Sequence, residues 1–172
     1  MRAGEGAGKN PRGTTSAGNG EIMPAESLPL LKIVKAHERI ELPQYESEGA
    51  AGMDLRAFLD CDVTIPSLGR VKIPTGLKLE IPAGYEAQVR PRSGLAARSG
   101  LTVLNSPGTI DSDYRGELEI ILINLGSGDV IIKDGERVAQ LVVSPVCRAR
   151  FVETDELAQS QRGSGGFGST GV

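Results

Sequence analysis

The stretch Arg70-Val-Lys-Ile-Pro-Thr-Gly-Leu-Lys-Leu-Glu-Ile-Pro-Ala-Gly-Tyr-Glu-Ala-Gln-Val-Arg90 decides the fold class of this 172-residue chain. Short runs that are apolar or alternate apolar with polar residues are typical of β-strands, and they occur here at Arg70 to Ile73, Leu77 to Ile81 and Glu86 to Arg90. The tripeptides between them are rich in Pro and Gly, which favour turns: Pro74-Thr75-Gly76 and Pro82-Ala83-Gly84. The pattern predicts consecutive short strands joined by turns.

The same alternation of strand-length runs and turn residues continues on both sides of this stretch. Further strands are predicted at Leu31 to Val34, Asp62 to Ile65, Leu118 to Asn124, Val130 to Ile132 and Val138 to Val143. A turn is expected at Ser67-Leu68-Gly69 and a hairpin from Leu101 to Ile110. The one helix predicted is short, from Ser93 to Arg98, with Gly100 positioned to end it. The fold class is therefore all-β, a distorted jelly-roll barrel or sandwich with one short helix.

Composition limits the classes of partner and compartment. Aromatic residues make up only 3% of the chain and Trp is absent, so Val, Ile and Leu must form the core. The net charge of -3 does not provide the basic face that nucleic acid requires, and no apolar run is long enough to span a membrane. Cys61, Cys147 and the single His37 indicate neither a disulfide framework nor a zinc site. With no secretory signal visible, we expect a cytoplasmic protein.

The two ends of the chain differ in composition from its middle. Residues 1 to 27 are rich in small and polar residues, so we expect a disordered extension, either native or an added leader. Residues 28 to 155 carry the predicted jelly-roll domain. Residues 156 to 172 end in Arg162-Gly-Ser-Gly-Gly-Phe-Gly-Ser-Thr-Gly171, which is typical of a flexible linker but contains one aromatic residue, Phe167. Such a flexible arm could wrap phosphates with its backbone N–H groups while the ring stacks on a base.

A dense polar cluster lies at Gly108-Thr-Ile-Asp-Ser-Asp-Tyr-Arg-Gly-Glu117. In an extended strand Asp111 and Asp113 would point to the same face, where two like charges repel unless a cation lies between them. A solvated turn is the plain alternative, because Asp, Ser and Gly are ordinary turn residues. The cluster alone does not decide between a chemical site and a turn.

Three more polar segments interrupt the strand pattern: Ala51-Gly-Met-Asp-Leu-Arg-Ala57, Pro91-Arg-Ser-Gly-Leu-Ala96 and Gly135-Glu-Arg-Val-Ala-Gln-Leu141. With Gly108 to Glu117 and the glycine-rich arm, they have the order and spacing of the five motifs of the trimeric deoxyuridine triphosphate nucleotidohydrolase (dUTPase) family. The chain strongly resembles this family over residues 28 to 172. The resemblance implies hydrolysis of dUTP to dUMP and pyrophosphate, which supplies dUMP for thymidylate synthesis and limits uracil in DNA.

The resemblance also implies roles for single residues. Asp111 matches the general base that activates water for attack on the α-phosphorus. Asp54 matches an outer-shell carboxylate that contacts Mg²⁺ through water, whereas Arg56 is expected to pair with a carboxylate or line a subunit contact. Substrate-binding positions follow from the motifs: Arg92, Ser93, Gly94 and Gln140 at phosphate; Asn105, Gly108, Thr109 and Ile110 near uracil; Tyr114 on the deoxyribose; and Arg162, Ser164, Gly165, Phe167, Gly168, Ser169 and Thr170 in the closing arm. A homotrimer with shared active sites is implied as well.

Two other functions stay open at this point. A dCTP deaminase of the same fold would need an acid or base at the pyrimidine ring, often Glu, and the segment from Asn105 to Ser112 contains no glutamate. A non-catalytic deoxynucleotide-binding protein would be favoured if Asp111 or the arm were missing, and both are present.

Overall fold

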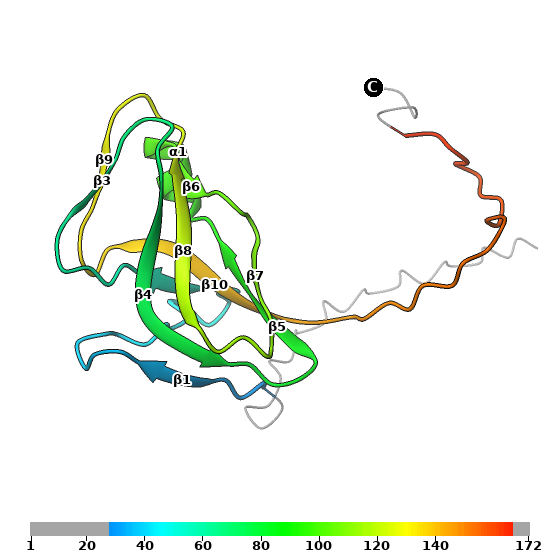
Figure 1. The fold of residues 1–172 in the computed structure, drawn as a ribbon, viewed down its shortest axis with the longest axis horizontal. Coiled ribbons are helices and arrows are strands. Elements are labelled where there is room, and N and C mark those ends of the chain that lie inside the picture. Colours follow the sequence, from blue (N-terminus) through cyan, green and yellow to red (C-terminus); the bar gives the residue numbers. More distant parts are fainter. Residues whose placement is uncertain (1–27, 167–172) are drawn as a thin grey trace, which may run out of the picture. The chain divides into compact units, whose positions relative to one another are not determined.

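A computed structural model describes residues 28–166 (Figure 1). In these residues the chain forms two four-stranded sheets, a pair of strands and one helix. The elements are β1 (Lys32–Lys35), β2 (Met53–Arg56), β3 (Val63–Ile65), β4 (Arg70–Glu80), β5 (Tyr85–Arg90), α1 (Ser93–Ser99), β6 (Leu101–Val103), β7 (Gly108–Ile110), β8 (Glu117–Asn124), β9 (Val130–Ile132) and β10 (Arg137–Pro145). The predicted all-β class with one short helix is confirmed.

The strands are ordered so that neighbours along the chain are often in different sheets. One sheet has the order β1-β4-β8-β6, the other has the order β2-β10-β5-β7, and β3 pairs with β9. All these pairs are antiparallel. Leu118, Ile120 and Leu122 alternate along β8 into a core that also takes Leu55, Val89 and Leu141 from the other sheet. Aliphatic side chains from both sheets thus fill one core, as the composition predicted.

The predicted turn at Pro74-Thr75-Gly76 is wrong, because β4 runs through it without a break. The tripeptide forms an irregularity instead: the β4–β8 register shifts between Pro74 and Lys78, and Gly76 has a φ of 67°. The polar groups of the shifted segment bond to β8, since Thr75 Oγ1 donates to the carbonyl of Leu118 and the Gly76 N–H donates to Glu117 Oε1 at 2.8 Å. Pro and Gly occur at β-bulges as well as in turns, so their presence does not distinguish the two.

The predicted hairpin from Leu101 to Ile110 is wrong too. β6 pairs with β8 and β7 pairs with β5, so the segment between them crosses from one sheet to the other. The next residues do not continue as a strand: Asp111 to Tyr114 form a turn, with the Tyr114 N–H donating to the Asp111 carbonyl at 3.2 Å. The interpretation of Asp111 and Asp113 as neighbours on one face of a strand is therefore corrected to that of turn residues.

The helix α1 ends where the sequence predicted. Gly100 follows it with a φ of 71°, and its N–H donates to the Ala96 carbonyl. A Cβ on Gly100 would lie 2.5 Å from the backbone nitrogen of Gly126, so two backbones approach closely here. Glycine is required both for the left-handed conformation and for this approach.

After β10 the described chain has neither helix nor strand from residue 146 to 166, and almost all of these residues are exposed. The extension of residues 1 to 27 and the arm residues Phe167, Gly168, Ser169 and Thr170 lie outside the described residues. Between residues 28 and 166, no helix has the length and apolar character needed to cross a membrane.

Candidate active site

The sheet β2-β10-β5-β7 carries the predicted site residues of four motifs. Asp54 on β2 is the cross-strand neighbour of Gln140 on β10, and Gln140 is in turn opposite Arg90 on β5. Two residues after Arg90 the chain reaches Arg92, the residue that precedes α1. Side chains of three motifs therefore meet at the end of β5.

An arginine–aspartate–arginine cluster lies at this end of the sheet. Asp54 Oδ1 is 2.9 Å from Arg92 Nε, and Asp54 Oδ2 is 3.0 Å from Arg137 Nη1. The side chain of Asp54 is only 16% exposed, so these two partners stabilise a carboxylate that is largely removed from water. Arg92 Nη1 also donates to the backbone carbonyl of Arg137 at 3.2 Å. Glu46 lies at the edge of the cluster, with its Oε1 3.8 Å from Arg137 Nη1.

Gln140 lies beside this cluster and is fixed by its neighbours. Its Nε2 donates to the Pro91 carbonyl at 2.9 Å, immediately before Arg92. A Cβ on Gly52 would lie 2.5 Å from Gln140 Oε1, so glycine at position 52 leaves the space that this side chain occupies. Ser93 begins α1 with an exposed side chain, and Gly94 follows it. The structure thus brings together Asp54, Arg92 and Gln140, and Ser93 and Gly94 follow Arg92 in the chain; their binding of phosphate stays a prediction.

A second polar group forms around Asp111, which is exposed at the end of β7. Asp111 and Tyr114 line a hollow of about 200 Å³ together with Lys72, Thr109, Ile110, Glu117, Glu119 and Ile121. The Tyr114 hydroxyl donates to the carbonyl of Glu117 at 2.9 Å. At the rim, the hydrogen bond from Lys72 to Glu119 raises the pKa of Lys72 above its ordinary value, which keeps this amine protonated. Asp111, Thr109, Ile110 and Tyr114 are brought together as predicted.

Asn105 precedes β7, and Gly108 is the first residue of that strand. The Asn105 Nδ2 would be 3.1 Å from a Cβ placed on Gly108, and Gly108 itself is buried. The amide side chain therefore lies close to the backbone of Gly108. Asn105 belongs to the connection between the two sheets rather than to a hairpin.

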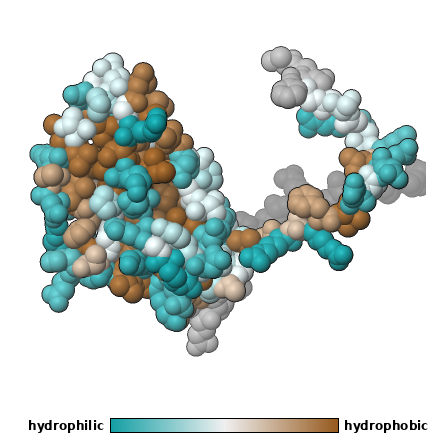
Figure 2. Space-filling view, in the orientation of Figure 1, coloured by the Kyte–Doolittle hydropathy of each residue, from teal (hydrophilic) through white to brown (hydrophobic). Residues whose placement is uncertain are grey.

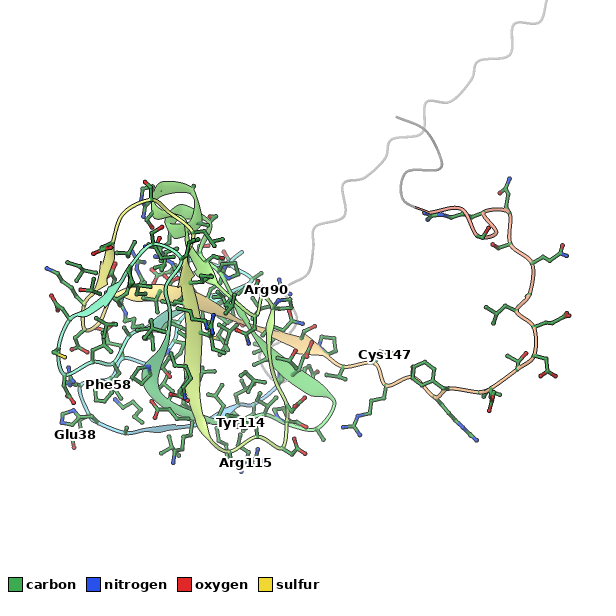
Figure 3. All side chains as sticks on the ribbon, turned by 45° about the horizontal axis from the view of Figure 1, so that its top comes forward. Glu38, Phe58, Arg90, Tyr114, Arg115 and Cys147 are labelled. Carbon is green, nitrogen blue, oxygen red and sulfur yellow. The ribbon has the colours of Figure 1, made fainter. Side chains whose placement is uncertain are left out.

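The two groups lie at opposite ends of β5. Ile110 is opposite Ala87 and Gly108 is opposite Val89, so β7 runs towards the beginning of β5 whereas Arg92 follows its end. Asp111 is thus level with Glu86, six residues before Arg92, and at about 3.3 Å per residue the two ends are about 20 Å apart. Figure 3 shows Arg90 and Tyr114 well separated on the fold. One protomer does not bring Asp111 to the arginine cluster.

The described part of the arm bonds within itself. Arg162 Nε donates to the Gly165 carbonyl at 2.7 Å, and Ser164 is exposed beside it. The structure therefore does not bring Arg162, Ser164 or Gly165 to either polar group by hydrogen bonds. The remaining predicted arm residues are outside the described range.

Another hollow, of about 180 Å³, lies behind Asp54, where Arg39, Arg56, Phe58 and Asp134 line it. Its charges are paired: Arg39 with Asp134, and Arg56 with Glu41 at 3.1 Å. The Leu59 N–H and Arg39 both hold the pKa of Asp134 below its usual range. The pairing of Arg56 with a carboxylate confirms the expectation for that residue.

The chemistry of the described residues suits a magnesium ion that arrives with its ligand. Within residues 28–166 no three His, Cys, Asp or Glu side chains are grouped to hold a metal. Mg²⁺ at nucleotide sites takes its ligands mainly from phosphates and waters, with one or two carboxylates. Asp54 accepts from two arginines, and a carboxylate has about four lone-pair positions, so it retains capacity for a metal-bound water.

Sequence reasoning missed Arg137 and Gly116. Arg137 is within one of the quoted motifs, but no pattern in the sequence showed that it would reach Asp54 across two strands. Gly116 lies beside Tyr114, and a Cβ there would overlap the ring and hydroxyl of that residue. Arg115 separates the two residues in the sequence, so this approach becomes apparent only once the ring is placed.

The paired sheets and the polar groups at both ends of one of them define a jelly-roll protein with a divided polar site. A family model described as dUTPase matches residues 38–171. The chain belongs to the dUTPase family. Curated relatives include the deoxyuridine 5'-triphosphate nucleotidohydrolase of Rhizobium etli, 54% identical with 86% of this chain and 97% of the relative covered. That of Bdellovibrio bacteriovorus is 61% identical, with 76% and 88% covered.

Solved structures agree with this assignment. The dUTPase of Staphylococcus bacteriophage 80alpha with dUPNHPP matches with a TM-score of 0.75 at 26% identity, covering 83% of this chain and 99% of that one. The order of strands found here is therefore that of a dUTPase fold.

Proposed function

We propose that the protein hydrolyses dUTP to dUMP and pyrophosphate, and so supplies dUMP for thymidylate synthesis and limits uracil in DNA. The observation that carries the proposal is the presence, on one sheet, of an arginine cluster around Arg92 and of an exposed aspartate beside Tyr114, in a chain of the dUTPase family. The cluster suits a triphosphate, because guanidinium groups bind phosphate oxygens with charge-assisted hydrogen bonds.

Asp111 acts as the general base. An ionised carboxylate accepts a proton from water, and the water oxygen forms a bond to the α-phosphorus while the bond to the bridging oxygen breaks. Pyrophosphate leaves with the electrons of that bond. The exposure of Asp111 at the end of β7 allows a water molecule and a substrate to reach it.

Arg92, Ser93, Gly94 and Gln140 bind the phosphates from the other end of the sheet. Mg²⁺, when bound with the substrate, neutralises charge on the leaving pyrophosphate. In the proposal Asp54 contacts this ion through water while it remains paired with the arginines. Arg162, Ser164, Gly165, Phe167, Gly168, Ser169 and Thr170 of the arm close over the bound nucleotide and exclude bulk water.

Asn105 and the backbone of Gly108 to Ile110 read the uracil edge. The side-chain amide and the strand backbone together pair with the uracil edge, and cytosine presents donors and acceptors swapped relative to uracil. Tyr114 packs on the deoxyribose, where its ring leaves no volume for a 2′-hydroxyl.

A homotrimer with shared sites is part of the proposal. The separation of about 20 Å between Asp111 and Arg92, which follows from strand geometry, requires that a complete site take these residues from different subunits. Apolar surface supports association: Phe151 is 96% and Leu157 is 88% exposed after β10. Ile121 and Ile123 alternate with the buried residues of β8 and so face away from the core, and Figure 2 shows apolar side chains gathered over this strand.

The proposed location is the cytoplasm. Cys61 and Cys147 are both free and exposed in the described residues, which suits a reducing compartment.

The test is pyrophosphate release from dUTP, dCTP, dTTP and UTP, each with Mg²⁺ and with a chelator. Rapid release from dUTP alone, reduced by the chelator, is the expected result. Ammonia release from dCTP would instead indicate a deaminase, and tight dUTP binding without turnover would indicate a non-catalytic binding protein.

A further inference from the structure

We propose that Arg137 is a positioning residue that holds Arg92 and Asp54 in the geometry needed to bind the phosphate chain. The inference rests on the proposed function for the identity of the ligand. It assigns a role to a residue that neither the motif resemblance nor the comparisons single out.

Arg137 contacts both members of the cluster, one with its side chain and one with its backbone. Its Nη1 donates to Asp54 Oδ2 at 3.0 Å, and its carbonyl accepts from Arg92 Nη1 at 3.2 Å. Asp54 completes the triangle by accepting from Arg92 Nε at 2.9 Å. Arg92 is thus held at two of its nitrogens by groups that Arg137 supplies or orients.

A bulge in β10 places Arg137 on the side of the sheet that carries Asp54. The β10–β2 register shifts between Arg137 and Ala139, and both Val138 and Ala139 are buried. Regular alternation along a strand would put Arg137 and Gln140 on opposite faces, since they are three residues apart. With one extra residue facing the core, both side chains point to the same face. The bulge therefore serves the site and explains why the pattern did not reveal Arg137.

The arrangement leaves Arg92 able to bind an anion. A guanidinium has five N–H donors, and the two bonds to Asp54 and to the Arg137 carbonyl use two of them. Without Arg137, Asp54 would lose one partner and be free to rotate towards Arg92, which would then present fewer donors to phosphate. Fixing a long side chain before binding also lowers the entropy lost when the ligand arrives.

Arg56 provides a matched control in the same part of the fold. It is 40% exposed, against 42% for Arg137, and its Nε is 3.1 Å from Glu41 Oε2. Its Nη1 donates to the Gly135 carbonyl at 2.9 Å, whereas the side chain of Arg137 pairs with Asp54 and lies 3.8 Å from Glu46. Neither partner of Arg56 is Asp54 or Arg92.

The experiment measures the affinity of the full chain for pyrophosphate and for deoxyuridine by calorimetry, in the wild type, Arg137→Gln and Arg56→Gln. Loss of a charge-assisted contact that orients Arg92 is expected to weaken pyrophosphate binding about ten-fold or more in Arg137→Gln. Arg56→Gln is expected to stay within about two-fold of the wild type, and deoxyuridine binding to stay within about two-fold in both variants. Equal pyrophosphate affinities in the two variants, or no pyrophosphate binding by the wild type, would overturn the inference.

A double-mutant comparison separates positioning from direct contact. If Arg137 acts through Arg92, then adding Arg137→Gln to Arg92→Gln costs little further pyrophosphate affinity, because the group being positioned is already gone. Full additivity of the two losses would show that Arg137 binds the anion itself and would refute the positioning role. Should Arg137→Gln not fold, Arg137→Lys takes its place, with a smaller fall expected because one ammonium replaces the guanidinium.

Pyrophosphate binding needs no turnover, so failure of this inference is distinguishable from failure of the proposed function. If the protein does not hydrolyse dUTP but its affinity for pyrophosphate depends on Arg137, the inference holds and the proposed function is wrong. If the protein hydrolyses dUTP but Arg137→Gln and Arg56→Gln have equal pyrophosphate affinities, the proposed function holds and the inference is wrong.

Discussion

Tyr114 owes its position to one hydrogen bond and to a neighbour without a side chain. Its hydroxyl donates to the Glu117 carbonyl at 2.9 Å, and a Cβ on Gly116 would overlap its ring and hydroxyl. In the proposed site this ring excludes ribose. Gly116 therefore leaves the space that the Tyr114 ring occupies.

We predict that Gly116→Ala displaces the Tyr114 ring and reduces the preference for dUTP over UTP, measured as the ratio of kcat/KM values, by about ten-fold or more. Gly128→Ala is the control, because a Cβ there meets nothing within 4 Å. A ratio that changes equally in both variants, or in neither, would remove Gly116 from the sugar site.

Asp111→Asn keeps the size of the side chain and removes its ability to accept a proton. We expect the single-turnover rate with dUTP to fall by about 10²-fold to 10⁴-fold, the range typical of a lost general base, with nucleotide affinity retained. Asp113→Asn, in the same turn, is the control and should change the rate little. A slow Asp113 variant with a fast Asp111 variant would show that the base had been assigned to the wrong carboxylate.

The motifs with fixed spacing indicated where the site residues lie along the chain, but they did not indicate the contacts of Arg137 and Gly116, which belong to the same motifs. Arg137 reaches Asp54 only because a bulge turns its side chain, and a register shift leaves no mark in the local pattern. Gly116 matters through the space it leaves, which becomes visible only when the ring is placed. The roles of the arm residues stay predictions.

At the scale of elements, Asn124 at the end of β8 joins three segments of chain. It is fully buried, and its Nδ2 donates to the carbonyls of Ile65 and Gly128 at 2.9 and 2.7 Å. Its Oδ1 accepts from the Gly126 N–H at 2.9 Å. The side chain thus connects β3 and the turn before β9 to the β1-β4-β8-β6 sheet by hydrogen bonds.

Asn124→Leu has a similar volume and leaves those backbone groups without partners. We predict a loss of about 3 kcal/mol in the free energy of unfolding, since each unsatisfied buried group costs about 1–3 kcal/mol. Urea unfolding at one fixed protein concentration measures it, because association also contributes to stability. Ser67→Ala is the control: its hydroxyl bonds the Gly126 carbonyl at an exposed position of the same turn, so about 1 kcal/mol or less is expected. Equal losses would show that burial of Asn124 is unimportant.

The elements themselves were mostly predictable, and the two errors have a common physical origin. Alternation identified strands such as β8, which buries one regular face, and residue propensity with the glycine stop identified the helix from Ser93. These signals failed at Pro74-Thr75-Gly76 and between Leu101 and Ile110, where the outcome depends on which strand supplies the partner. The local sequence pattern does not indicate which strands pair, because the pairing depends on the whole fold.

For the whole molecule, the division of polar groups between the two ends of β5 is the main consequence of the fold. Asp111 continues from β7 at one end, and Arg92 follows β5 at the other. A separation of about 20 Å along the strand is too long for one α-phosphate to contact both side chains in one protomer. The proposed site is complete only when protomers associate.

The measurement that tests this claim most directly is complementation between two inactive variants. Asp111→Asn and Arg92→Gln proteins are unfolded together in equal amounts, refolded, and assayed for pyrophosphate release from dUTP, with each variant refolded alone as the control. If the two residues come from different subunits, about half of each residue position is wild type, so about a quarter of the sites are intact and about a quarter of wild-type activity returns. If the mixture stays as inactive as the separate variants, Asp111 and Arg92 act within one protomer and the shared site is contradicted.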